Sequence, residues 1–188
     1  RWRERIVRTD ADETFAVGLI YGPSGCGKSS LVKAGLLPRL PDTVIPIYIE
    51  AAPELTEERL LARIRRQCPA LPERPLDESI AMIRRGVVLD PGKKILIVID
   101  QFEQWLYAHQ GDAATELVRT LRQCDGGRVQ CLLLVRDDFW MAVTRLMREL
   151  EINIADDSNA GGVDLFDTRH AKKVLTMLGR AHNALPAG

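Results

Sequence analysis

Short apolar runs alternate along the chain with longer segments of helical periodicity. The runs are rich in valine, isoleucine and leucine, and they have the length of strands that are buried on both faces. Pro46 interrupts one of them, and because proline removes a ladder hydrogen bond, it predicts an edge position or a bulge there. The predicted strands cover residues 15–21, 44–50, 94–100 and 129–135, with a shorter candidate at 163–166.

Apolar residues at helical spacing fill most of the intervals between these strands. Thr56 is expected to cap one helix, and either Asp137 or Asp138 another, because short polar side chains satisfy the free amides of a first turn. Residues 125–127, Asp-Gly-Gly, predict a turn, and the polar segment 153–162 predicts a flexible loop. The predicted helices cover residues 28–37, 56–68, 77–85, 112–124, 139–150 and 168–182.

The order of these elements predicts the fold class. Strands that alternate with helices favour an α/β fold of three layers, in which helices flank a mainly parallel central sheet of about five strands. The 188 residues, of which 46% are hydrophobic and 28% charged, are enough for one domain with a substantial core. Because the sequence begins at Arg1 rather than at a methionine, we expect residues 1–188 to be a fragment of a longer multidomain protein.

Charge and cysteine content narrow the classes of partner and compartment. The chain has 26 Lys plus Arg against 26 Asp plus Glu, so no global positive field favours nucleic acid or anionic lipid. Its apolar runs are far shorter than the roughly 18 residues of a membrane-spanning helix. Four scattered cysteines match neither a zinc site nor a disulfide scaffold, which favours reduced thiols and a cytoplasmic location. These are Cys26, Cys68, Cys124 and Cys131.

Three arginines form a basic stripe on the predicted helix 56–68. Arg59, Arg63 and Arg66 lie opposite its apolar face. We interpret the stripe as a solvated helix face in preference to a partner-binding patch, because charge runs on helices usually face water. The three histidines of the chain are scattered, which favours surface positions over metal coordination.

Residues 22–29 match a phosphate-binding pattern: a glycine, four residues of any type, a second glycine, a lysine, and a serine or threonine. The match lies between a predicted strand and a predicted helix, where backbone amides at a helix N-terminus can surround phosphate oxygens. Lys28 is expected to contact the β- and γ-phosphates, the Ser29 hydroxyl to coordinate Mg²⁺, and Ser30 to support the α-phosphate. The predicted site for ATP or ADP comprises Gly22, Pro23, Ser24, Gly25, Cys26, Gly27, Lys28, Ser29 and Ser30.

Cys26 lies inside this loop, next to the start of a predicted helix. A helix N-terminus favours reactivity of a nearby thiol, which predicts that bound nucleotide shields Cys26 from alkylation. The alternative, which we favour, is that cysteine is tolerated at this position because it is small.

An acid ends the apolar strand predicted at 94–100. Asp100 in this position is typical of a Walker B motif, whose carboxylate holds Mg²⁺ directly or through water, although it can also simply cap the strand end. Glu103 is the candidate catalytic residue, because hydrolysis requires a group that polarises water near the γ-phosphate. Gln101 stands directly after Asp100, where many ATPases place glutamate, so adjacency alone does not identify the base.

Arg136 follows the apolar strand predicted at 129–135. Parallel strands present their carboxyl ends to the ligand crevice, so Arg136 is a candidate sensor of the γ-phosphate. An ion pair with Asp137 or Asp138 is an equally supported role for the same side chain.

Three segments together resemble the novel STAND NTPases, signal-transducing ATPases related to the AAA+ and NACHT classes. They are GPSGCGKSSLVKAGLLPRL from Gly22, LIVIDQFEQW from Leu96 and LLLVRDDF from Leu132. The resemblance implies a five-stranded parallel core with an additional strand between the phosphate-loop and Walker B strands. It also implies a nucleotide-gated switch, in which ADP holds a closed monomer and ATP permits self-association that activates a fused effector. The same resemblance assigns Lys28, Ser29, Asp100, Glu103 and Arg136 the roles given above.

One departure from the family pattern concerns turnover. Such proteins commonly carry two consecutive acids after Asp-Gln-Phe, whereas here Glu103 is followed by Gln104. The leading hypothesis is therefore a regulatory, slowly hydrolysing ATPase, and the alternative is a nucleotide-binding scaffold without turnover. A small-molecule kinase would need an acceptor pocket and lid arginines, for which no segment is evident. A nucleic-acid motor is least favoured, because charge is balanced and no basic, aromatic-interleaved run is present.

Overall fold

Five parallel strands form a single central sheet in the computed structural model, which describes residues 1–10, 13–109, 115–156, 158–165 and 176. The strand order across the sheet is β2-β3-β4-β1-β5. This arrangement confirms the predicted α/β class, and β4 is the expected additional strand between β1 and β3. The strands are β1 (Val17–Gly22), β2 (Val44–Glu50), β3 (Lys94–Asp100), β4 (Val129–Arg136) and β5 (Ala160–Gly162).

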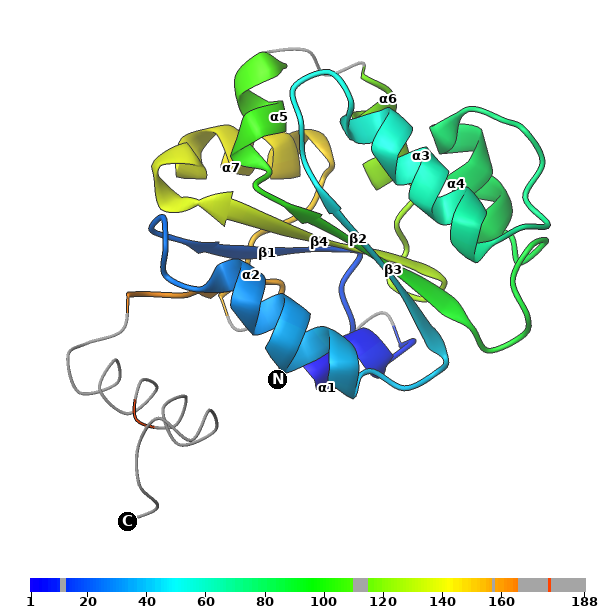
Figure 1. Cartoon of the computed structure of the whole chain (residues 1–188), viewed down its shortest axis with the longest axis horizontal. Coiled ribbons are helices and arrows are strands. Elements are labelled where there is room, and N and C mark those ends of the chain that lie inside the picture. The colour runs from blue at the N-terminus through cyan, green and yellow to red at the C-terminus, as the bar shows by residue number, and fades with distance from the viewer. Residues whose placement is uncertain (11–12, 110–114, 157, 166–175, 177–188) are drawn as a thin grey trace.

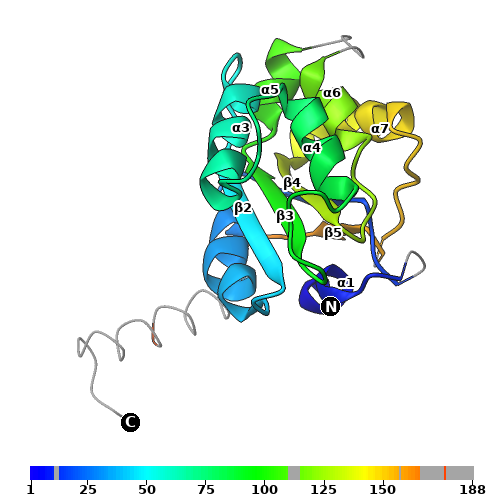
Figure 2. The same ribbon diagram turned by 90° about the vertical axis from the view of Figure 1, so that its right-hand side faces the viewer.

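Helices cover both faces of the sheet and produce three layers (Figures 1 and 2). One face carries α1 and the helical segment that follows the phosphate loop, and the other carries α3 to α7. The first group comprises α1 (Trp2–Val7), α2 (Lys28–Ser30), the π-helical η1 (Leu31–Leu36) and the 3-10 turn η2 (Leu37–Arg39). The second comprises α3 (Thr56–Gln67), α4 (Leu76–Arg84), α5 (Glu103–Ala108), α6 (Glu116–Leu121), the 3-10 turn η3 (Asp137–Phe139) and α7 (Trp140–Glu149).

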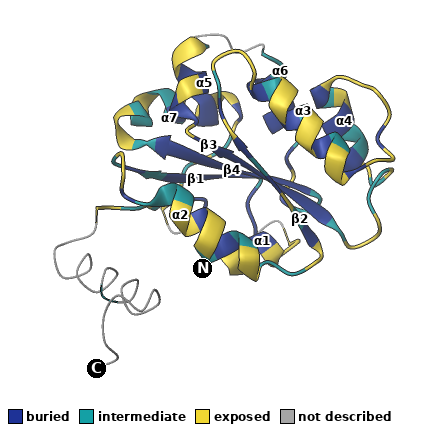
Figure 3. Cartoon of the chain, in the orientation of Figure 1, coloured by how far each residue is buried: buried dark blue, intermediate teal, exposed yellow. Residues whose placement is uncertain are grey.

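The central strands are buried on both faces, as their near-continuous apolar sequences predict (Figure 3). Every residue of β3 is buried. Leu96 and Val98 pack on the face of η1, where Val32 lies, whereas Ile97 and Ile99 pack on the face of α3. The sheet therefore packs between two layers of apolar side chains, one on each face. This packing fixes the carboxyl ends of its strands relative to one another.

β2 is an edge strand, which is one of the two alternatives, an edge position or a bulge, that Pro46 predicts. The Ala51 amide donates to the Asp100 carbonyl at 2.8 Å, and the Lys94 amide donates to the Thr43 carbonyl at 2.9 Å. The amides and carbonyls of odd-numbered residues of β2 therefore face β3. The amides and carbonyls of even-numbered residues point away from β3, because the backbone groups of successive strand residues point to opposite sides. Pro46 therefore occupies a position at which no ladder hydrogen bond is lost.

Several predicted helix starts differ from the structure. Thr56 is the first residue of α3 rather than its cap, and its hydroxyl donates to the Ala52 carbonyl at 2.6 Å. Neither Asp137 nor Asp138 caps α7, because both belong to the turn η3 and Phe139 precedes the helix. The segment after the phosphate loop remains helical to Arg39, past the predicted end at residue 37, with Pro38 in its final 3-10 turn.

The last part of the chain also differs from prediction. The final strand is β5, three residues earlier than the candidate at 163–166, within the segment predicted to be a loop. It forms because the edge of β1 is free to pair. Residues Leu19–Tyr21 of β1 pair with Ala160–Gly162 of β5. Apart from residue 176, the helix predicted at 168–182 lies outside the described residues, as does the start of the one predicted at 112–124. Helix α5 was not predicted. The turn at residues 125–127 is confirmed by three amides that donate to the Asp125 carboxylate.

Lys94 is a buried cation at the start of β3. Its ammonium donates to the Arg8 carbonyl at 2.9 Å and to the Gly126 carbonyl at 2.6 Å. Burial lowers the pKa of Lys94 to about 8, because a charged amine loses its hydration there. These bonds attach the N-terminal segment to the amino end of the sheet, opposite the predicted nucleotide site.

Candidate functional site: the phosphate loop and the acidic strand ends

The phosphate loop connects β1 to α2 and opens away from the protein. Gly25 and Gly27 have φ angles of 79° and 92°, in the left-handed region that favours glycine. A Cβ atom added at either residue would have no other protein atom within 4 Å. The two glycines therefore allow a turn that other residues resist, and the positions that their side chains would occupy are open.

The loop presents backbone donors that the protein itself does not use. Within the described residues, the amides of Gly25, Gly27, Lys28 and Ser29 donate no hydrogen bond, whereas the Leu31 amide donates to the Gly27 carbonyl at 2.8 Å. The first amides of a helix lack intrahelical acceptors and carry partial positive charge. A cluster of free amides in a glycine loop can donate hydrogen bonds to the oxygens of a polyphosphate.

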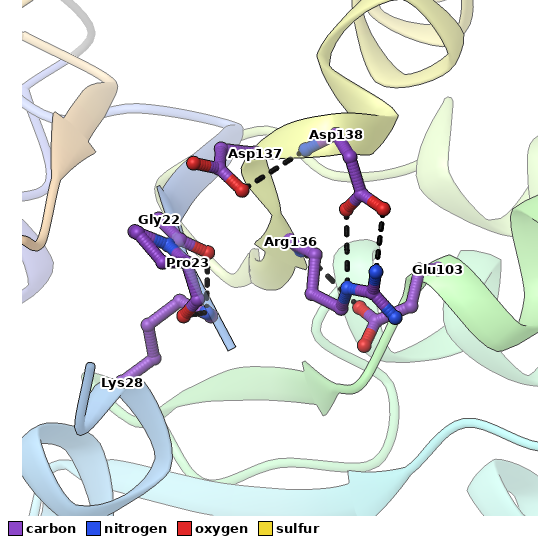
Figure 4. A network of polar contacts seen from close by, with 7 residues as sticks. All are labelled: Gly22, Pro23, Lys28, Glu103, Arg136, Asp137 and Asp138. Atoms are coloured by element: carbon purple, nitrogen blue, oxygen red, sulfur yellow. Dashed lines mark hydrogen bonds and ion pairs between the residues drawn. The ribbon is translucent and has the colours of Figure 1, made fainter. Parts of the chain in front are cut away.

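Lys28 folds back over the loop (Figure 4). Its ammonium donates to the Gly22 carbonyl at 2.7 Å and to the Pro23 carbonyl at 2.9 Å. Cys26 lies on the inner side of the same turn, with Sγ 3.6 Å from Lys28 Nζ and only 2% of its surface exposed. This burial favours the interpretation that Cys26 fills the loop interior over a reactive role.

Asp100 ends β3 and is nearly buried, with 3% of its surface exposed. One carboxylate oxygen accepts the Gln101 amide at 2.8 Å, and the other accepts the hydroxyl of Tyr48. Burial is the main cause that raises the pKa of Tyr48, and the hydrogen bond to Asp100 raises it further. The hydrogen bond with the Ser29 hydroxyl lowers the pKa by a smaller amount. The phenol therefore stays protonated and donates to the Asp100 carboxylate, beside the predicted magnesium ligand Ser29.

Tyr48 is a site residue that sequence analysis missed. It reaches Asp100 because the register of β2 and β3 places Glu50 opposite Asp100 and Tyr48 opposite Val98. A tyrosine near the carboxyl end of a predicted strand is the signal that was available, since such ends converge on the ligand crevice. The register that brings the two side chains together is a tertiary property.

Glu103 and Arg136 meet at the carboxyl end of β4 (Figure 4). Glu103 lies in the first turn of α5 with 8% of its surface exposed, and its Oε2 accepts the Arg136 amide at 3.3 Å. The Arg136 guanidinium turns towards Asp138 instead, with Nε–Oδ1 and Nη2–Oδ2 distances of 3.1 and 2.5 Å. Arg136 also lies opposite Gly22 in the β1–β4 register, which places it beside the phosphate loop.

Gln101 adopts a left-handed backbone, with φ 53°, directly after Asp100. A side chain other than glycine in this region costs about 1 kcal/mol and persists only where its surroundings determine it. Gln101 is exposed, whereas Glu103 is buried at the end of β4. The turn thus directs Glu103, and not its neighbour, into the protein beside Arg136.

These residues fit a magnesium nucleotide. The free amides and Lys28 suit phosphate oxygens, and Ser29 with Asp100 provides oxygen ligands of the kind that Mg²⁺ prefers. Among the described residues, no group of three His, Cys, Asp or Glu side chains could hold a metal by itself. Mg²⁺ would therefore rely on phosphate and water oxygens as well, as is common for this ion.

Comparison with protein families identifies the domain. A family model described as novel STAND NTPase 1 matches residues 3–176. The chain belongs to this family. It is accordingly a nucleotide-binding P-loop NTPase domain, and the resemblance drawn from the sequence motifs is confirmed. A comparison with curated proteins finds no match.

Solved structures with a similar fold include ORC proteins and a Walker-type ATPase. ORC2 of Aeropyrum pernix, solved as ADPNP-ADP complexes, is 21% identical with a TM-score of 0.63, over 88% of this chain and 46% of its own. A Walker-type ATPase of Pyrococcus abyssi is 15% identical with a TM-score of 0.61, over 99% of this chain and 59% of its own. Drosophila ORC bound to DNA is 17% identical with a TM-score of 0.58, over 94% of this chain and 43% of its own.

At these identities the similarity establishes the fold alone, and this STAND domain spans about half the length of the proteins that it matches. In the described part of the chain, no helix is long and apolar enough to cross a membrane.

Proposed function

We propose that this STAND domain binds ATP with Mg²⁺ and acts as a slowly hydrolysing regulatory switch. The observation that carries the proposal is the convergence at one edge of the sheet of the open phosphate loop, Asp100 and Glu103. The amides of the loop and Lys28 would bind the phosphates, while Ser29 and Asp100 would hold Mg²⁺. When bound, Mg²⁺ neutralises charge on the β- and γ-phosphates.

Glu103 is the group best placed to orient an attacking water. Its Oε2 is held by the Arg136 amide, which leaves the other carboxylate oxygen available to accept a proton or hydrogen bond from water. A buried carboxylate at a strand end is fixed in position, and positioning is the main requirement of phosphoryl transfer to water. This assignment explains how hydrolysis could proceed with glutamine at position 101.

Arg136 supplies the conformational readout in this proposal. Its guanidinium is paired with Asp138, on the turn that leads into α7. Contact with a γ-phosphate would require Arg136 to leave Asp138, and that exchange would release the turn from its ion pair. The nucleotide state is thereby linked to α7, an element on the outer layer of the domain.

A scaffold that binds nucleotide without turnover is the second candidate. It is favoured by one observation, the pair of glutamines Gln101 and Gln104 that flank Glu103 at positions where acids are usual in this class. The two candidates share the binding site and differ in whether ATP is consumed.

The switch is tested by measuring the mass of the full-length protein by sedimentation velocity without nucleotide, with Mg-ADP and with Mg-ATP. We expect larger assemblies with Mg-ATP than with Mg-ADP, and calorimetry of the same samples should show that both nucleotides bind. Binding of both nucleotides with no change in mass would refute the switch and favour the scaffold. No binding of either would refute the nucleotide site itself.

Tyr48→Phe tests the support that β2 gives to the magnesium site. The variant removes the hydroxyl that donates to Asp100, and a hydrogen bond to a charged group contributes about 1.5–3 kcal/mol. We therefore expect Mg-ATP affinity to fall by about 10- to 150-fold, with ATP affinity in EDTA unchanged. Calorimetric titrations with and without Mg²⁺ measure both values. An equal loss in EDTA would mean that Tyr48 supports the loop rather than the metal.

A further inference from the structure

A groove on the outer side of β2 lies next to the nucleotide site and shares Tyr48 with it. Its volume is about 680 Å³, and none of residues 22–30 lines it. One wall belongs to η1, the floor is the end of β2, and the other wall is α3. The polar residues that line it are Lys33, Tyr48, Glu50, Arg59, Arg63 and Arg66.

The groove is strongly basic. Arg59, Arg63 and Arg66 recur at spacings of four and three residues, so they form one stripe along α3. Within the described residues, the side chains of Arg63 and Arg66 form no ion pair or hydrogen bond, and the Arg59 guanidinium donates one long bond of 3.4 Å to the Glu50 carbonyl. The single acid in the lining, Glu50, is paired with Lys33 at 3.1 Å. The arginine stripe therefore faces the groove without counter-charges.

The floor of the groove offers an unpaired strand edge. Even-numbered peptide groups of β2 point away from β3, and these include Tyr48 and Glu50. In the described chain, the amides of Tyr48 and Glu50 and the Tyr48 carbonyl have no backbone partner. Pro46 closes this edge on its N-terminal side, so the open stretch is short. Such an edge can pair with an additional extended segment.

We propose that this groove binds an acidic peptide segment in an extended conformation. Its backbone pairs with β2 at Tyr48 and Glu50, and its carboxylates face the arginine stripe of α3. Alternate side chains of a strand lie on one face about 6.6 Å apart, and residues four apart on a helix are separated by about 6 Å of rise. Acids at every second position therefore match Arg59 and Arg63 in spacing.

The backbone requirement favours a peptide over a nucleic acid. The free Tyr48 and Glu50 edge presents both donors and an acceptor, and a strand satisfies both kinds of group. The backbone of DNA carries acceptors only, so it would leave the Tyr48 carbonyl without a partner, and the single 2′-hydroxyl of each RNA nucleotide does not reproduce the alternating donors and acceptors of a strand. The proposal does not depend on nucleotide hydrolysis, because none of its contacts involves the phosphate loop.

Fluorescence anisotropy with a labelled peptide of alternating glutamate and valine tests the proposal on the whole protein. We expect saturable binding, no binding of the matched lysine–valine peptide, and a loss of binding when alternate peptide amides are N-methylated. The Arg59→Glu/Arg63→Glu variant should weaken binding by about 10-fold or more, since each reversal replaces an attraction with a repulsion. Arg145→Glu, an exposed arginine within α7, is the matched control and should bind like the wild type.

Two further measurements separate strand pairing from simple charge attraction. Hydrogen exchange at the Tyr48 and Glu50 amides should slow when the peptide binds, and circular dichroism should show that the double variant is folded. Equal binding of the N-methylated peptide would overturn the proposal, because the strand edge would not be used. Tighter binding of a single-stranded oligonucleotide of equal length would also overturn it and would assign the groove to nucleic acid.

Discussion

Replacing Glu103 with glutamine is expected to lower ATP turnover by about 100- to 10,000-fold, the contribution typical of a positioned acid or base. The change keeps the size of the side chain. It also keeps an oxygen that can accept a hydrogen bond from the Arg136 amide, which in the wild type lies 3.3 Å from Glu103 Oε2. It removes the charge that would orient and polarise water. Turnover is measured as phosphate release under saturating Mg-ATP, and binding is measured by calorimetry on the same samples.

The matched control for this variant is Asp137→Asn. Asp137 is another acid at the carboxyl end of β4, but its Oδ1 accepts only the adjacent Asp138 amide at 3.0 Å among the described contacts. We expect this control to keep turnover within about twofold of the wild type. If Glu103→Gln retains full turnover, then Glu103 has only a structural role at Arg136. Wild-type protein that binds Mg-ATP without releasing phosphate would favour the scaffold over the enzyme.

The second large effect is expected for Lys28→Met, which keeps the length of the side chain but removes its positive charge. We expect Mg-ATP affinity to fall by at least about 100-fold, because charge-assisted hydrogen bonds to phosphate each contribute about 1.5–3 kcal/mol. Mg-ADP affinity should fall less, since Lys28 would lose fewer phosphate contacts there. Calorimetric titration of both nucleotides measures the two changes.

Lys33→Met is the control for position and charge. Lys33 lies on the same helical segment as Lys28, is exposed, and pairs with Glu50 rather than with the phosphate loop. Nucleotide affinity should stay within about twofold in this variant. Thermal unfolding must accompany the Lys28→Met titration, because Lys28 also bonds the Gly22 and Pro23 carbonyls. Unchanged Mg-ATP affinity in folded Lys28→Met would mean that residues 22–30 do not form the triphosphate site.

Local patterns in the sequence determined the elements and the phosphate loop. The run at 94–100 is apolar without alternation because β3 is covered on both faces, and its predicted bounds match the strand. The glycines of the loop could be interpreted without tertiary information, because left-handed turns and open backbone amides are local requirements. Pro46 likewise predicted an edge position or a bulge, and the strand lies at the edge, where a missing amide is tolerated at an outward-facing position.

The tertiary structure alone decided which distant side chains meet. Tyr48 reaches Asp100 through the pairing of β2 with β3, and Arg136 turns to Asp138 while its amide binds Glu103. The free edge of β2 faces an unpaired arginine stripe only because α3 packs beside it. Periodicity reports which face of an element is buried, but strand order and register depend on packing between segments far apart in the chain. For this reason, the sequence predicted the phosphate loop and the Walker B acid, whereas the partners of these residues came from the fold.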